Sequence, residues 1–155
     1  MSGFEYADFI WDNSITTPWK RFPWNLRAEY EQNLRARLNV GFAPSKQDKA
    51  YWFDTSLGQQ KNKHDVQVGY SWWRTEQDAV ISSFNQDDQR AATNVLQNRV
   101  YANYLLTPST TAGFTWWNGR TLNTGLQNAL LAPGVTKGLK EPRLNRFQFD
   151  LIYKF

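Results

Sequence analysis

The sequence predicts an all-β fold of about seven antiparallel strands in up-and-down order, and three observations lead to this prediction. Apolar and polar side chains alternate with a period of two along several stretches, which is the pattern of a strand with two different faces. The connections between these stretches alternate between short and long, and aromatic residues recur at two levels along the strands. Helix-period patterns are missing except at residues 122–131, where one short helix could form in a loop.

The clearest alternation lies in the last ten residues, 146–155. One face carries Phe147, Phe149, Leu151, Tyr153 and Phe155, and the other carries Arg146, Gln148, Asp150, Ile152 and Lys154. A strand with lipid on one side and water on the other has this pattern. A half-buried strand of a soluble protein has it too, so the rest of the chain must decide between the two.

The remaining strands follow in order along the chain. The same alternation, with uncertain phase in the first case, marks residues 4–11, 24–34, 51–57, 66 towards 84, 96–106 and 112–117. Between them lie polar or proline-containing segments, at residues 13–23, 41–49, 59–65, 85–94, 107–110 and 119–143. These connections allow every strand to pair with its neighbour in sequence.

Two regularities favour lipid as the medium on the apolar face. Short connections around Pro108 and at residues 59–65 fall at the end where the last strand finishes, and the longer ones fall at the opposite end. Transmembrane β-barrels have short turns at one end and long loops at the other, with aromatic girdles between. We therefore expect one set of side chains to face lipid or form the girdles: Tyr70, Trp72, Tyr104, Phe114, Trp116, Phe147, Phe149, Leu151 and Tyr153.

Composition limits the other possibilities. The 155 residues suffice for one domain, and 16% of them are aromatic, yet the mean hydropathy is −0.67 and no run is long enough for a transmembrane helix. The net charge of +4 comes from interspersed charges, which gives little support for nucleic-acid binding. The chain has no cysteine, and its first six residues lack the basic and apolar regions of a signal peptide.

The side chains that could carry chemistry have ordinary explanations. Glu29 and Glu31 share one strand face, but the paired carboxylates of a glycosidase usually come from different strands around a cleft. His64 is the only histidine and lies in a charged turn, so no zinc site is expected. Asp87 and Asp88 do not have the spacing of a calcium-binding loop. We expect no enzymatic activity, no metal and no cofactor.

Two stretches resemble a known family. Residues 65–88 contain Val-Gly-Tyr followed by Asp78-Ala79-Val80, residues 110–121 read Thr-Thr-Ala-Gly-Phe-Thr-Trp-Trp-Asn-Gly-Arg-Thr, and the chain ends in Tyr-Lys-Phe. Over residues 50–155 this resembles the C-terminal part of a bacterial outer-membrane porin family. The resemblance implies location in the outer membrane, passive diffusion of small polar solutes, and recognition of Phe155 by the barrel-assembly machinery.

The family has a signal peptide and more strands than this sequence provides. Residues 1–155 are therefore expected to be the C-terminal portion of one larger barrel, an open and curved sheet completed by preceding strands, because about seven strands cannot close in lipid. The polar faces would then line the pore: Arg27, Glu29, Glu31, Asp54, Gln67, Arg99, Asn103, Arg146, Gln148, Asp150 and Lys154.

Two other functions fit the same residues. A soluble all-β carbohydrate-binding module would use tryptophan rings as stacking platforms, and a barrel could serve as an anchor or translocator instead of a pore. Trp73 and Trp117 are predicted to point to the polar face, where they would either form an aromatic track for sugars or pack against an inward-folded loop. The balance of charges does not indicate whether a pore would prefer cations or anions.

Overall fold

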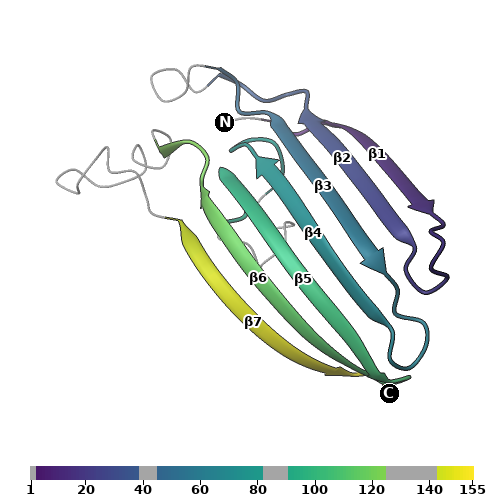
Figure 1. Ribbon diagram of the computed structural model, residues 1–155. Helices are drawn as coiled ribbons and strands as arrows, with labels where there is room; N and C mark the ends of the chain where they lie inside the picture. Colours follow the sequence, from purple (N-terminus) through teal and green to yellow (C-terminus); the bar gives the residue numbers. More distant parts are fainter. Residues whose placement is uncertain (1–2, 39–44, 82–90, 125–142) are drawn as a thin grey trace.

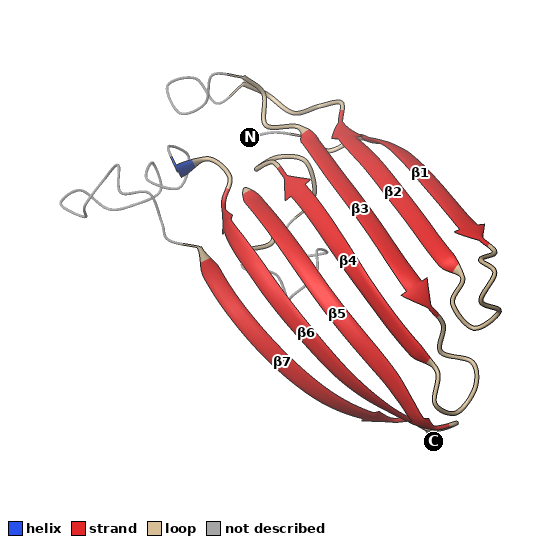
Figure 2. Ribbon diagram, in the orientation of Figure 1, coloured by secondary structure: helices blue, strands red, loops and turns tan. Residues whose placement is uncertain are grey.

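The computed structural model describes residues 3–38, 45–81, 91–124 and 143–155 (Figure 1). Seven antiparallel strands form one open sheet in which spatial order equals sequence order, as predicted. Figure 2 shows that strands account for almost all of its regular structure. The strands are β1 (Tyr6–Ile15), β2 (Trp24–Asn33), β3 (Lys49–Gly58), β4 (Val66–Thr75), β5 (Val95–Thr107), β6 (Thr110–Thr121) and β7 (Leu144–Tyr153).

Most predicted strand ends lie within two residues of those in the structure, and three differ by more. β1 continues to Ile15, because its polar second half pairs fully with β2 and cross-strand contacts outweigh weak strand propensity. β4 ends at Thr75, opposite Val95 at the start of β5, and does not continue towards Phe84, because the chain turns after Glu76. β6 extends to Thr121, opposite Val95. Most of the predicted helix at 122–131 lies outside the described residues.

The connections alternate in length along the chain. Residues 16–23, 59–65 and 108–109 join strands at the end of the sheet where β7 finishes, which we call the short-turn end (Figure 2). Residues 34–48, 76–94 and 122–143 join strands at the opposite end. Successive connections must lie at opposite ends of the sheet because the order is up-and-down. Their consistent difference in length, in contrast, is a property of the sequence.

The strand register places an uninterrupted apolar row across one face of the sheet. One residue from each strand contributes to it, in the order Ile15, Trp24, Leu57, Val68, Ala102, Phe114 and Phe149. Of these, Phe149 is 79% exposed and Val68 is 45% exposed. No described helix or second sheet covers this apolar face. Apolar side chains of the kind that a soluble protein would bury therefore lie on the surface of this sheet.

The opposite face is concave. Side chains from strands that are not neighbours meet there: Tyr101 of β5 reaches Asp54 of β3, and the rings of Trp73 in β4 and Trp117 in β6 lie 5.5 Å apart. Strands two apart in a flat sheet are separated by about 9.5 Å, and a bend towards this face brings the side chains that stand on it closer together. The bend is visible in Figure 1. Among the described residues, the buried apolar cluster of Trp73, Val95 and Trp117 also lies on this face.

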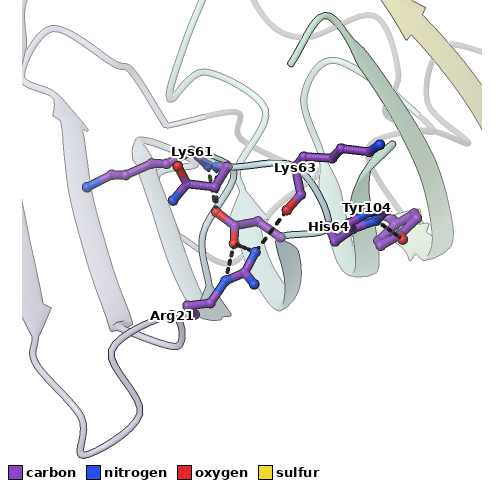
Figure 3. Close-up of polar contacts among 7 residues, drawn as sticks. Arg21, Lys61, Lys63, His64 and Tyr104 are labelled. Atoms are coloured by element: carbon purple, nitrogen blue, oxygen red, sulfur yellow. Dashed lines mark hydrogen bonds and ion pairs between the residues drawn. The ribbon is translucent and has the colours of Figure 1, made fainter. Parts of the chain in front are cut away.

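A polar cluster at the short-turn end joins two connections (Figure 3). The Asp65 carboxylate accepts hydrogen bonds from the backbone N–H groups of Lys61 and Asn62, at 3.0 and 2.7 Å, and forms an ion pair with Arg21. Arg21 also donates to the Lys63 carbonyl at 3.0 Å. The connection between β1 and β2 is thereby fixed to the connection between β3 and β4.

This cluster predicts a pH dependence of stability. The Asn62 N–H, together with Arg21 and the Lys61 N–H, outweighs the effect of burial and lowers the pKa of Asp65 from 3.8 to about 2. A carboxylate whose pKa is lower in the folded state stabilises the fold above its unfolded pKa, and this contribution is lost as the pH falls from 3.8 to about 2. In detergent, D65N should therefore unfold at a lower temperature than the wild type near neutral pH, and the difference should shrink towards about pH 2. A difference that does not change with pH would contradict this assignment.

Candidate functional site: the polar concave face

A row of polar and charged side chains, interrupted by Trp117 on β6, crosses the concave face at one register level. Each strand contributes one residue to this row, which we call the polar row: Asp12, Arg27, Asp54, Ser71, Arg99, Trp117 and Arg146. Acidic and basic side chains alternate over the first three strands. On every strand the residue of the polar row is three positions away from the residue of the apolar row. This odd spacing places the two rows on opposite faces, because successive side chains of a strand alternate between the faces.

Ion pairs join the charges of the polar row. The Arg27 Nε donates to Asp12 Oδ2 at 2.8 Å across β1 and β2. The Asp54 carboxylate accepts from Ser71 Oγ at 2.5 Å and lies 3.5 Å from Arg99 Nη2, and Arg99 Nε donates to Ser71 Oγ at 3.2 Å. Asp54, Ser71 and Arg99 thus form one hydrogen-bonded unit across three strands. Only 16% of the Asp54 side chain and 24% of the Arg99 side chain are exposed, so solvent screens this pair incompletely.

A glycine makes room for the aromatic ring beside this unit. The Tyr101 ring lies across β4 at Gly69, where an added Cβ would come within 2.3 Å of the tyrosine Cζ. The Tyr101 hydroxyl then donates to Asp54 Oδ1 at 3.3 Å, and the Arg99 guanidinium lies 4.6 Å from the centre of the same ring. Glycine in a strand interior often marks such a close approach.

The tryptophan rings of this face do not form an open platform. Trp73 and Trp117 meet edge to face and are only 4% and 5% exposed. Arg99 lies 5.4 Å from the centre of the Trp117 ring, and Arg27 lies 5.8 Å from that of Trp52. Packing against neighbouring side chains, and not an exposed stacking surface, is therefore the role that the structure gives to these two buried rings.

A depression of about 320 Å³ opens beside the polar row. Hydrogen-bonding groups dominate its wall, in particular Asn25, Arg27, Asp54, Gln67, Arg99 and Tyr101. The two arginines are each paired with a carboxylate, so the wall offers donors and acceptors of both kinds with little net charge. Such a wall can form hydrogen bonds with small polar molecules or guide ions through locally opposed charges.

The structure separates the two groups of residues that the sequence singled out. On the apolar face lie Tyr70, Trp72, Tyr104, Phe114, Trp116, Phe147, Phe149, Leu151 and Tyr153. On the concave face lie Arg27, Glu29, Glu31, Asp54, Gln67, Arg99, Asn103, Arg146, Gln148 and Asp150. Lys154 and Phe155 follow the end of β7. Of the second group, only Arg27, Asp54, Gln67 and Arg99 line the depression.

Several residues of the site were not predicted. Asp12 falls outside the predicted first strand, and Ser71 and Tyr101 carry no charge that would single them out. The glycine at position 69, in a strand opposite an aromatic residue, is the one available signal, but it identifies Tyr101 only when the register is known. Asp87 and Asp88 lie outside the described residues.

Within the described ranges there is no helix long and apolar enough to cross a membrane. The same part of the chain contains no group of three or more histidine or acidic side chains arranged to hold a metal ion. Fold and site together define an open, two-faced antiparallel sheet with an apolar outside and a polar concave inside. No protein-family model, curated protein or solved structure matches the chain.

Proposed function

We propose that this chain is part of a transmembrane β-barrel of the bacterial outer membrane, in which its concave face lines a channel for passive diffusion of small polar solutes or ions. The observation that carries the proposal is the apolar row, which continues across all seven strands without a polar residue. In water such a surface would be a site of aggregation, whereas acyl chains would solvate it.

The edges of the sheet support the same proposal. Among the described residues, β1 pairs only with β2 and β7 pairs only with β6, so two ten-residue edges keep unpaired backbone groups. Open edges do not occur in the hydrocarbon region of a membrane, because each unpaired N–H or C=O group costs several kcal/mol there. Further strands must therefore join β1 and β7 to complete the barrel.

The polar row supports the proposal that the barrel functions as a channel. Its paired charges lie on the side that a closed barrel would turn towards water, and the depression beside Asp54 leaves space for a small solute. The resemblance to the porin family supports the same class. It also suggests that the barrel-assembly machinery recognises the end of β7 through Phe155.

The experiment reconstitutes this chain, together with the strands that complete its barrel, into lipid vesicles, and is followed by extraction at alkaline pH and by conductance measurements in a planar bilayer. The proposal predicts that the protein stays in the membrane fraction after extraction and that discrete conductance steps appear. Recovery from the soluble fraction without detergent would instead indicate a soluble module. Membrane insertion without conductance would indicate an anchor or translocator and would overturn the channel.

A further inference from the structure

Basic side chains gather at the short-turn end of the sheet. Its connecting segments and the two residues after β7 contain five lysines or arginines and one acidic residue, Asp65. The ion pair with Arg21 neutralises Asp65, which leaves four charged side chains that we call the turn-end lysines: Lys20, Lys61, Lys63 and Lys154. They come from three segments that are distant in the sequence.

Hydrogen bonds hold these segments at one level. Arg21 joins the β1–β2 connection to the Lys63 carbonyl (Figure 3). The His64 N–H donates to the Leu105 carbonyl at 2.8 Å, beside the β5–β6 turn. The Lys154 N–H donates to the Ser109 carbonyl at 2.8 Å. The lysines therefore project from a connected rim, and not from independent loops.

All four turn-end lysines are exposed, and within the described residues none of their ammonium groups takes part in an ion pair. Exposed aromatic rings accompany them: Trp19 is 68% exposed beside Lys20, and Phe22 is 38% exposed. Aromatic rings and lysines just beyond an apolar band are typical of the boundary between acyl chains and headgroups.

From this arrangement we propose that the short-turn end binds the headgroups of anionic phospholipids in the adjacent leaflet. The inference rests on the proposed membrane function, since the lysines reach headgroups only if the apolar row lies among acyl chains. Unpaired ammonium groups attract a negatively charged lipid surface, and a single headgroup in contact with one of these lysines gains about a fivefold preference at low salt. The aromatic rings fix the depth at which this contact occurs.

Electron paramagnetic resonance with spin-labelled phosphatidylglycerol and spin-labelled phosphatidylcholine tests the proposal in proteoliposomes. Lipids in contact with the protein give a motionally restricted signal, and the ratio of the two restricted fractions gives the lipid preference. We expect wild-type protein to prefer phosphatidylglycerol by about two- to fivefold, less at high salt. The variant K20Q/K61Q/K63Q/K154Q should reduce the ratio to about one.

The matched control removes four positive charges from the opposite end, as R35Q/R37Q/K46Q/K49Q, and should keep the preference. Equal loss of the preference in both variants would mean that net charge alone attracts the lipid. A ratio of about one in the wild type would mean that the protein has no preference for the anionic lipid. Either result overturns the inference. If the wild-type ratio is about one, the motionally restricted signal itself would still be present, and the proposed function would stand. Absence of a restricted signal for both lipids would instead show that the apolar row does not contact acyl chains, and the proposed function would fail with it.

Discussion

Replacement of Val100 by arginine should lower the free energy of unfolding in lipid by about 2–4 kcal/mol, which is the cost of placing arginine on the lipid face near the middle of a membrane. Val100 lies on the apolar face of β5, next to Tyr70 of β4 and Trp116 of β6. It is near the centre of a strand that runs from Val95 to Thr107, so a long cationic side chain cannot easily reach either headgroup layer.

The matched control is N103R, which introduces the same charge on the same strand but on the concave face. We expect this variant to unfold within about 1 kcal/mol of the wild type, because a charge facing water loses little solvation. Urea titration of both proteins in vesicles provides the comparison. Equal destabilisation by the two substitutions would show that the two faces of β5 do not differ in their surroundings.

Substitution of Gly69 by alanine should cost about 1–3 kcal/mol, because the added methyl group would occupy the place of the Tyr101 ring. The ring must then turn away, which also removes its hydrogen bond to Asp54 and its contact with the Arg99 guanidinium. Thermal unfolding in detergent measures the loss. Conductance should change as well, because Tyr101 forms part of the wall beside the polar row.

A double-mutant cycle separates this contact from a general effect of the extra methyl group. In a Y101A background the ring is gone, so Gly69→Ala should be nearly neutral there or even stabilising, since alanine restricts the unfolded chain more than glycine does. An unchanged cost in that background would mean that backbone strain at position 69, and not the tyrosine ring, makes glycine necessary.

Much of the fold could be predicted, because period-two alternation encodes both the strands and their faces. Phe149 and Gln148 differ in polarity and are neighbours in sequence, so they must lie on opposite faces if the segment is a strand. The seven strands, their antiparallel order and the open sheet all follow from this pattern together with the turns. Strand ends were harder to predict from the sequence. β1, for example, continues through Asp12, Asn13 and Ser14 only because β2 offers partners for them.

The arrangement within the site could not be predicted for a different reason. Asp54, Ser71 and Arg99 form one unit because the register of β3, β4 and β5 places them opposite one another, and no local pattern encodes that register. The pairing of Arg21 with Asp65 depends likewise on how two turns meet. Polarity alone therefore gives the face of a side chain, but not its partner.

The absence of cysteine from the sequence permits a decisive comparison of the two faces with single nitroxide labels. Ala102 and Asn103 are adjacent on β5 and point to the apolar and the concave face. In a lipid bilayer, a label at A102C should be relaxed strongly by oxygen, which concentrates among acyl chains, and weakly by a water-soluble nickel complex. A label at N103C should show the reverse. Similar accessibility at both positions, or protection of Ala102 from both reagents, would mean that another protein layer covers the apolar row and that the sheet does not face lipid.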